Sequence, residues 1–503
     1  MLTPSEIQIV EQLKAELDAR YWEDERHYRY YRLRQTLEHL GMAIPPNMRR
    51  FTVFANWPRV VVRTIAGRQK VRALILPGEE QADPRLRAIW DASNLTAHTK
   101  MFRRDALISG RAYMSVGANE HNPELPLVRV ESPREMEALV DTRTETMTAA
   151  ARFFGKDAFG MGPTNVTLYL PEETIWIEKD ESGKWREQDR DSHGLGSVPV
   201  VMHLNERLSG AGFEGESELT DVIDLTDAVA RSLTNLQFAQ EGHGVPGKWA
   251  TGVQSGDFVD ENGKPISMFE AYYDVINMLT DKDAKWGQFR AADLKNFETA
   301  LNIYGGQAAL SYGFPARYFG INTTNPPAEG TVRADEIELI NGVEDKNEAE
   351  GMVLGWIGAL ALRFATGEWV EGNRVRVDYF DPGTPTIAQR VDALAKLRAT
   401  RDISREGMWD EMGWTEPRKA KERQYLAEEI AQESAVDLSF LNRGEDTGAV
   451  SALDPDEVKK RADAMAALYR AGVEPEDAAQ QAGLAGIRFR PGVQPITIRR
   501  DSE

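Results

Sequence analysis

Apolar side chains recur at steps of three and four residues in two stretches that a glycine-rich interruption separates. The first begins at Ser217, whose hydroxyl can accept a hydrogen bond from the free N–H groups of a first helical turn. The residues at this spacing share one helix face, and they are apolar except for one threonine: Leu219, Val222, Thr226, Val229, Leu233 and Leu236. The opposite face is acidic, and Pro246 with its neighbouring glycines ends the pattern. Helical spacing returns between Leu294 and Ala308, so the sequence predicts two helices that bracket a small excursion with β-like pieces at Lys248–Val253 and Tyr272–Leu279.

A proline-containing segment follows the second helix. It runs from Gly313 to Pro327 and cannot be helical throughout, because two adjacent prolines remove backbone donors. We expect an exposed loop. Apolar residues at helical spacing then extend from Ala328 to Phe364, which predicts a helix far longer than average. Glycines inside this stretch predict either a bend or break near one of them or a close approach of another backbone, and they are Gly342, Gly351, Gly355 and Gly358.

The other parts of the chain combine helices and strands. Helical spacing predicts one helix over 5–40 and helical structure over 85–109, whereas period-two alternation predicts short strands from Gly110 to about residue 204. A further strand is expected at Arg374–Tyr379. Four more helices are expected near the C-terminus, at about 386–399, 403–412, 416–433 and 455–470. The predicted fold class is therefore α+β.

This order of elements resembles the portal, or head-to-tail connector, proteins of tailed bacteriophages, particularly the long-tailed type. Val198-Pro199-Val200-Val201 and then Gly215-Glu216-Ser217-Glu218-Leu219 look like that family's entry into its stem. Asn325-Pro326-Pro327 followed by Ala328 to Glu336 looks like its tunnel loop and the start of its long helix. The resemblance covers most of the chain and is strongest from 198 to 400.

The resemblance implies a ring-forming portal fold with a mainly helical stem and crown. Its parts would be a wing at 1–213, stem helix 1 at 214–241, a clip at 242–291, stem helix 2 at 292–312, a tunnel loop at 313–330, a long kinked helix and wing return strand at 331–384, a helical crown at 385–485 and a tail at 486–503.

The same resemblance implies function and partners. A homododecameric ring at one capsid vertex would conduct double-stranded DNA during packaging and ejection. It would bind the large terminase subunit, a head–tail adaptor, the major capsid protein and the scaffold, with no catalytic site and no cofactor of its own. The tunnel-loop residues in contact with DNA would be Asn322, Thr323, Thr324, Asn325, Pro326 and Pro327. Acidic residues of the long helix, among them Asp335, Glu338 and Asp345, either face that channel or form a solvated helix face.

Amino-acid composition and net charge exclude several classes of protein and site. The chain of 503 residues has no cysteine, which excludes disulfides and thiolate metal sites and fits synthesis in a reducing cytoplasm. The resemblance implies that this is the cytoplasm of a host bacterium. Its N-terminal residues do not predict a secretory signal, and its most apolar window, 352–362, is too short to span a membrane. The formal net charge of -20 argues against a protein that grips nucleic acid tightly, because duplex binding relies on cations. It is compatible with a conduit, and also with an acidic protein that is simply soluble.

Two other interpretations stay open at this level. Residues 210–215 match G-x-G-x-x-G before a helix, which in an NAD-dependent enzyme would bind a pyrophosphate. Glu214, Glu216 and Glu218 would repel that group, so we expect a flexible turn. The histidines are scattered and predict no metal site. The second alternative is a structural adaptor that forms rings without conducting DNA.

Overall fold

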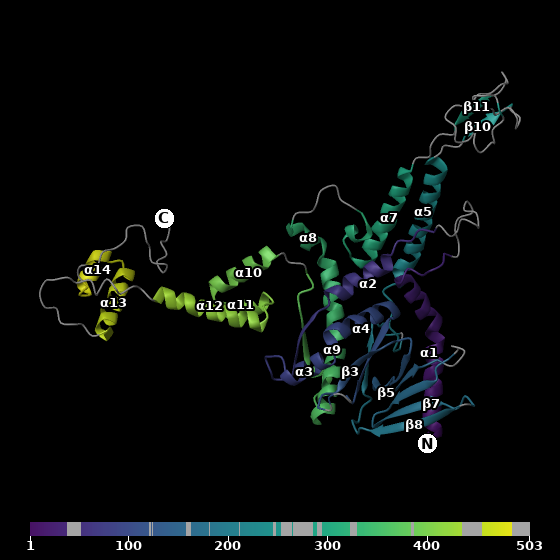
Figure 1. The fold of residues 1–503 in the computed structure, drawn as a ribbon, viewed down its shortest axis with the longest axis horizontal. Coiled ribbons are helices and arrows are strands. Elements are labelled where there is room, and N and C mark those ends of the chain that lie inside the picture. Colours follow the sequence, from purple (N-terminus) through teal and green to yellow (C-terminus); the bar gives the residue numbers. More distant parts are fainter. Residues whose placement is uncertain are drawn as a thin grey trace. The chain divides into compact units, whose positions relative to one another are not determined.

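The protein is described here by a computed structural model, and its elements divide into two units, Met1–Arg390 and Val391–Glu503 (Figure 1). The described residues are 1–37, 52–119, 122, 124–156, 162–180, 182–210, 212–244, 248–252, 264, 285–288, 294–321, 329–383, 387–434 and 455–484.

In the first unit, a long helix packs against a five-stranded antiparallel meander. The strands pair in chain order, and they are β4 (Met136–Asp141), β5 (Thr146–Phe154), β6 (Asn165–Tyr169), β7 (Glu173–Lys179) and β8 (Trp185–Ser192). Helix α1 (Pro4–Tyr31) lies against this sheet, where Leu13 packs with Leu168 and Ile175 in a shared core (Figure 1). Thr3 and Glu6 cap the start of α1 reciprocally.

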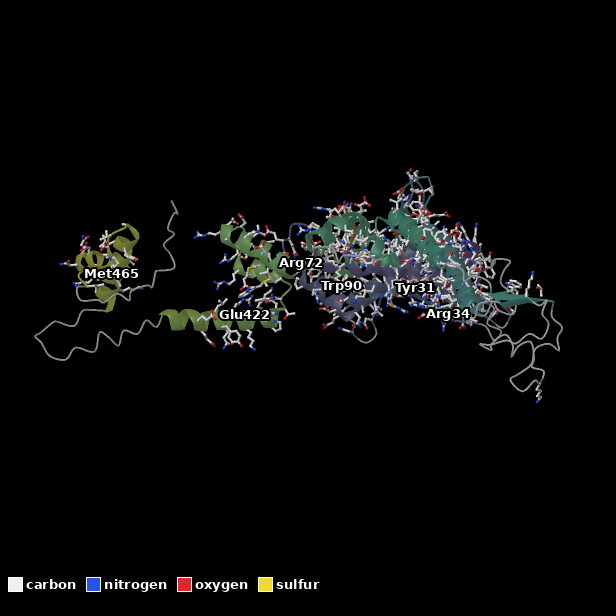
Figure 2. All side chains as sticks on the ribbon, turned by 90° about the horizontal axis from the view of Figure 1, so that it is seen from above. Tyr31, Arg34, Arg72, Trp90, Glu422 and Met465 are labelled. Atoms are coloured by element: carbon white, nitrogen blue, oxygen red, sulfur yellow. The ribbon has the colours of Figure 1, made fainter. Side chains whose placement is uncertain are left out.

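Helix α1 is shorter than the sequence predicts. It ends at Tyr31 and not near residue 40, because Leu33 adopts a left-handed conformation with φ of 57°. The backbone N–H of Arg34 then bonds to the carbonyl of Arg29 at 2.8 Å, which closes the last turn. Figure 2 labels Tyr31 and Arg34 beside each other at this end of the helix.

The largest core surrounds a three-stranded antiparallel sheet in the order β3-β2-β9. Its strands are β2 (Arg111–Gly117), β3 (Leu127–Glu131) and β9 (Val200–Leu204), and its helices are α3 (Pro84–Ala92) and α4 (Leu95–Ser109). The predicted helical stretch 85–109 is thus two helices, since Asn94 is left-handed with φ of 51°. Strands β1 (Val71–Ile75) and β12 (Arg376–Tyr379) pair antiparallel beside this core. In Figure 2, Arg72 marks β1 and Trp90 marks α3.

Two long helices run side by side in opposite directions, as the periodicity predicts. They are α5 (Thr220–Gly244) and α7 (Lys295–Tyr312) (Figure 1). Together with α2 (Trp57–Arg68) they form a second core around Val61, Leu219 and Ala308. Between them in the chain, β10 (Lys248–Thr251) and β11 (Lys285–Gln288) pair antiparallel. The expected strand at 272–279 lies outside the described residues.

The long C-terminal helix of this unit is broken at its start. The 3-10 helix η2 (Ala316–Phe319) precedes it, α8 (Glu329–Asp335) begins it, and α9 (Ile337–Thr366) follows after Glu336. The break therefore falls at Glu336 and not at a glycine. The alternative prediction, that another backbone comes close to one of these glycines, is correct for Gly355. An added Cβ there would lie 2.5 Å from the carbonyl oxygen of Gly372 in the 3-10 helix η3 (Gly372–Arg374).

The second unit is helical in its described part. Its helices are α10 (Ile387–Thr400), which begins in the first unit, α11 (Arg405–Glu411), α12 (Glu416–Ser434), α13 (Pro455–Arg470) and α14 (Pro475–Gln481). Four of them were predicted, whereas α14 was not. Glu422 marks α12 and Met465 marks α13 in Figure 2. Among the described helices, none has the length and apolar character that crossing a bilayer would demand.

Candidate functional site

Residues on either side of the predicted tunnel loop are tied to each other. Arg317 of η2 donates a hydrogen bond to the Glu336 carboxylate at 2.6 Å and forms an ion pair with Asp335. The hydroxyl of Tyr318 donates to the same Glu336 oxygen at 3.0 Å. The described residues that flank 322–328 in the chain are therefore joined to each other, whereas 322–328 lie outside the described residues. We call Arg317, Tyr318, Asp335 and Glu336 the loop base.

A second cation anchors the loop base to the body of the protein. Arg68, at the end of α2, lies 3.1 Å from Glu336 through Nη2 and donates to the Tyr318 hydroxyl at 2.9 Å. Its Nη1 also donates to the carbonyl of Pro382 at 2.7 Å. Glu336 is only 3% exposed, so two guanidinium groups compensate a buried carboxylate. The helix break at Glu336 turns this side chain inward, where it joins α2, η2 and α8.

An acidic groove of about 510 Å³ lies between α9, the end of α7 and the start of α5. Glu218 and Asp221 line it from the α5 side, and Glu338 and Asp345 line it from α9. Glu338 and Asp345 are seven positions apart, which places them on one face of α9, and both are exposed. The groove presents mainly negative charge to solvent.

Lys346 is the cation that holds this groove together. Its ammonium group donates to the Asn205 side-chain oxygen at 3.1 Å and to Glu206 at 2.5 Å, and it pairs with Glu218. Burial alone would lower the pKa of Lys346, but the carboxylates of Glu218 and Glu206 raise it above its ordinary value. Lys346 is thus charged at neutral pH and joins α9 to the turn after β9 and to the start of α5.

The start of α5 is fixed by neutral hydrogen bonds as well. The hydroxyl of Tyr312, the last residue of α7, donates to the carbonyl of Glu218. Burial and the negative charges of Glu218 and Asp221 raise the pKa of this phenol. Ser217 donates to the Ile108 carbonyl at 2.6 Å and accepts from the Leu219 N–H at 3.1 Å. The predicted capping residue therefore orders the turn before α5, which begins at Thr220.

The predicted site residues have three different outcomes. Asp335 belongs to the loop base, and Glu338 and Asp345 line the acidic groove. The six tunnel-loop residues Asn322, Thr323, Thr324, Asn325, Pro326 and Pro327 lie outside the described residues. Sequence reasoning did not single out Arg68, Arg317 or Glu336 as a cluster. Their separation along the chain carries no periodic signal. One feature of the sequence pointed to Lys346. In the acidic part of the predicted long helix, up to position 350, the only cations are Arg333 and Lys346.

The glycine turn at 210–215 is a packing feature. An added Cβ at Gly215 would lie 2.0 Å from the carbonyl oxygen of Gly110, so two backbones meet there. The preceding strand β9 pairs antiparallel with β2, whereas a dinucleotide fold continues a parallel sheet. Arg20 pairs with Glu214 at 3.0 Å. The turn therefore serves the junction of α4, β9 and α5, which argues against the NAD-dependent alternative.

The family model and the relatives that match this chain all belong to phage portal proteins. Residues 10–435 match the family described as phage portal protein, SPP1 Gp6-like. The portal protein of Mycobacterium phage D29 is 33% identical over 414 residues, which cover 80% of this chain and 84% of that protein. The portal protein of Mycobacterium phage L5 is 32% identical over 424 residues, with 82% and 86% covered.

Solved structures with some likeness come from gene transfer agent particles. The neck of an empty particle, determined with C6 symmetry, has a TM-score of 0.39 at 14% identity and covers 75% of this chain and 95% of that one. The neck of a native particle with C12 symmetry has the same TM-score, 14% identity, and coverage of 77% and 99%. The sequence matches decide the assignment: this chain belongs to the SPP1 Gp6-like family of phage portal proteins, which are structural components of the tailed-phage virion and not enzymes.

Proposed function

We propose that twelve copies of this chain assemble into a ring at one capsid vertex, and that the viral genome passes through the ring during packaging and ejection. The loop base is the observation that carries this proposal. A loop that must touch moving DNA needs fixed ends, and the contacts of Arg317 with Asp335 and Glu336 fix both of them. Arg68 ties the same point to the protein body, so force on the loop would pass into α2 and the core around it.

The elements of the first unit suit the parts of a portal subunit. In the proposal, α5 and α7 form the stem, and the pair β10–β11 that joins them belongs to the clip. The strands β2 to β9 with α1 to α4 form the wing, and α10 to α14 belong to the crown. Residues 322–328, between η2 and α8, are then the part of the tunnel loop that points into the lumen. Phe314 and Phe319, which the sequence placed in an exposed loop, are instead buried in the core around α2. Figure 1 shows α5 and α7 side by side with β10 and β11 following their far ends.

The charge of the chain suits a conduit that holds DNA weakly. Each lysine or arginine that pairs with a phosphate releases counterions and strengthens binding, so a cationic wall would slow translocation. Here the acidic groove carries Glu338 and Asp345, and the net charge is -20. We propose that these side chains, with Asp335, face the channel side of the ring and repel the backbone phosphates. The polar loop residues Asn322 to Asn325 would touch DNA without an ionic grip.

The proposed partners follow from the position at the vertex. The large terminase subunit would dock during packaging, and a head–tail adaptor would replace it afterwards. The major capsid protein and the scaffold would surround the ring during head assembly. Supporting this set is the membership of the chain in the portal family, together with two mycobacteriophage relatives named portal protein.

Electron microscopy of the full-length protein, alone and in assembled heads, tests this proposal. A ring with an axial hole wide enough for a duplex, located at a single vertex of each head, would support it. Rings without a continuous hole would favour a structural adaptor, and the absence of any ring in heads would overturn the proposal.

A further inference from the structure

An apolar groove lies on the first unit, separate from the loop base and the acidic groove. It has a volume of about 610 Å³ and runs between α9, β9 and the hairpin of β4 and β5. Met352 and Trp356 line it from one face of α9, and Trp369 closes one end. The side chains of Trp356 and Trp369 lie 6.2 Å apart by ring centroids. Met352 is 60% exposed, so this apolar surface is open to solvent in the single chain.

An aromatic projection lies on a different surface. Trp22 of α1 is 73% exposed, and its indole meets the Tyr21 ring edge to face at a centroid distance of 5.2 Å. Open apolar patches of this kind mark interaction sites, and tryptophan is the side chain most enriched at the energetic centre of interfaces. The described residues of the first unit therefore cover neither the groove nor Trp22.

The geometry of α1 prevents Trp22 from entering its own groove. Arg20 pairs with Glu214, and Glu214 follows Phe213, which lines the groove. Trp22 lies two positions further along the helix, about 200° around its axis, so it points away from that side. Buried contacts hold α1 in place, since Arg111 donates to Asp24 at 2.9 Å within the core. In Figure 1, α1 and α9 lie on opposite sides of strands β3 and β5.

One charged residue beside each surface has the opposite sign to one beside the other. Glu23, next to Trp22, is exposed on α1, whereas Asp18 is paired with Lys14. Arg363 lies beside the groove, 4.6 Å from the Trp369 ring centroid, whereas Arg207 is paired at 3.0 Å with Glu145, which also lines the groove. An interface between two different patches of identical chains is head to tail, and it closes into a ring when the rotation allows.

We infer that the apolar groove receives Trp22 of a neighbouring copy of this chain, and that this contact joins wing to wing around the ring. The inference rests on the proposed ring and adds the residues that join its subunits. Trp22 fills the groove between Met352, Trp356 and Trp369, while Glu23 approaches Arg363. An indole that buries about 150–250 Å² supplies the centre of a larger interface, since a stable one needs about 800 Å² per partner.

Cross-linking tests the contact without interference, because the chain has no native cysteine. The double variant Trp22→Cys/Met352→Cys is treated with a short bis-maleimide in rings whose assembly is first verified by electron microscopy. Met101→Cys/Met352→Cys is the matched control, because Met101 is an exposed residue of α4 and not of α1. The expected result is a ladder of covalent multimers from the Trp22 pair and none from the control.

Substitution gives a second readout. Trp22→Ala should raise the subunit concentration needed for ring formation at least about 10-fold, since truncation of such a centre weakens each contact by that order. Trp22→Phe should recover part of the loss, and Met101→Ala should have no effect. Either normal ring formation by Trp22→Ala or equal cross-linking from the two cysteine pairs would overturn the inference while leaving the proposed function intact. Cross-links to capsid protein in place of a second copy would also overturn it. A wild-type protein that forms no ring would overturn both.

Discussion

The Arg317 guanidinium and the Glu336 carboxylate lie 2.6 Å apart, and together with the ion pair between Arg317 and Asp335 they close the base of the segment that contains residues 322–328. The contact is a charge-assisted hydrogen bond to a buried acceptor, which is stronger than an exposed ion pair. Fixing both ends of a loop also reduces the conformational entropy that the loop would lose on touching another molecule.

Removing the Glu336 carboxylate should destabilise the first unit. Glu336→Ala leaves Arg68 and Arg317 facing a buried position without their acceptor, which should cost about 3–5 kcal/mol. Asp335→Ala removes an exposed partner of the same Arg317 and should cost less than about 1 kcal/mol. Urea denaturation monitored by tryptophan fluorescence measures both. Equal losses from the two variants would contradict the description of the loop base.

A second buried ion pair should respond to paired substitution. Arg103 donates to Glu350 at 2.7 Å, and the side chains are 4% and 1% exposed. Glu350→Ala should cost about 3–5 kcal/mol, because a buried guanidinium then lacks its counter-charge. Arg103→Met/Glu350→Leu removes both charges and should cost less than Glu350→Ala alone. The comparison is made by denaturation, and a double variant at least as unstable as Glu350→Ala would contradict the prediction.

Glycine substitutions distinguish packing from flexibility in the turn at 210–215. Gly215→Ala places a Cβ 2.0 Å from the Gly110 carbonyl oxygen and should cost about 3 kcal/mol. Gly210→Ala meets nothing within 4 Å and should change stability by less than about 0.5 kcal/mol. Thermal unfolding of the two variants and the wild type checks the difference. Saturable binding of a dinucleotide that Gly212→Ala abolishes would instead restore the enzyme interpretation.

Periodicity predicted the helices well and their ends poorly. The helices α5, α7 and α9 have long amphipathic faces, and these faces mark them in the sequence whatever they pack against. Their interruptions depend on single residues. Leu33 and Asn94 are left-handed. Asparagine adopts this conformation more readily than most residues, so Asn94 carried a weak signal, whereas Leu33 carried none. Leu33 in particular is a residue that sequence rules place inside a helix.

The site was harder to predict than the fold because its members are distant in sequence. Arg68, Arg317 and Glu336 meet only after α2, η2 and α8 have packed. The sequence singled out Asp335, Glu338 and Asp345 because they lie on one acidic stretch, yet Asp335 differs from the other two in having the Arg317 partner. Helical spacing alone could not show that Asp335 lies in a different environment from Glu338 and Asp345. The break at Glu336 ends one helix and starts another, so the residues before and after it do not share one helix face.

Buried His203 should make stability fall as the solution is acidified. Burial, with the nearby charges of Lys346 and Arg103, lowers the pKa of His203 to about 4, whereas an unfolded chain has a histidine pKa near 6.5. On acidification the unfolded chain therefore binds a proton at His203 before the folded chain does. Above pH ~6.5 the free energy of unfolding is unaffected by protonation of His203, and it decreases as the pH falls from there toward 4. The loss between pH 8 and pH 5 should be about 2 kcal/mol.

Other groups titrate in the same range, so the measurement is a difference. Burial raises the pKa of Asp105 to about 6, which favours the folded state on acidification and opposes the effect of His203. Free energies of unfolding are compared for wild type and His203→Gln at pH 8 and pH 5. The wild type should lose about 2 kcal/mol more than the variant. His98→Gln, at a less buried histidine, is the control. Parallel pH profiles for wild type and His203→Gln would contradict the prediction.

The most direct test of the conduit measures DNA packaging with a charged tunnel loop. Heads are assembled with Asn322→Lys/Thr323→Lys/Asn325→Lys, and Asn322→Gln/Thr323→Ser/Asn325→Gln serves as the uncharged control. The proposal predicts slower DNA passage for the lysine variant, with a deficit that shrinks as salt rises because the added phosphate contacts are electrostatic. The control should package like wild type. Packaging rates and DNA retention identical to wild type at every salt concentration would contradict the claim that residues 322–327 line the path of the genome.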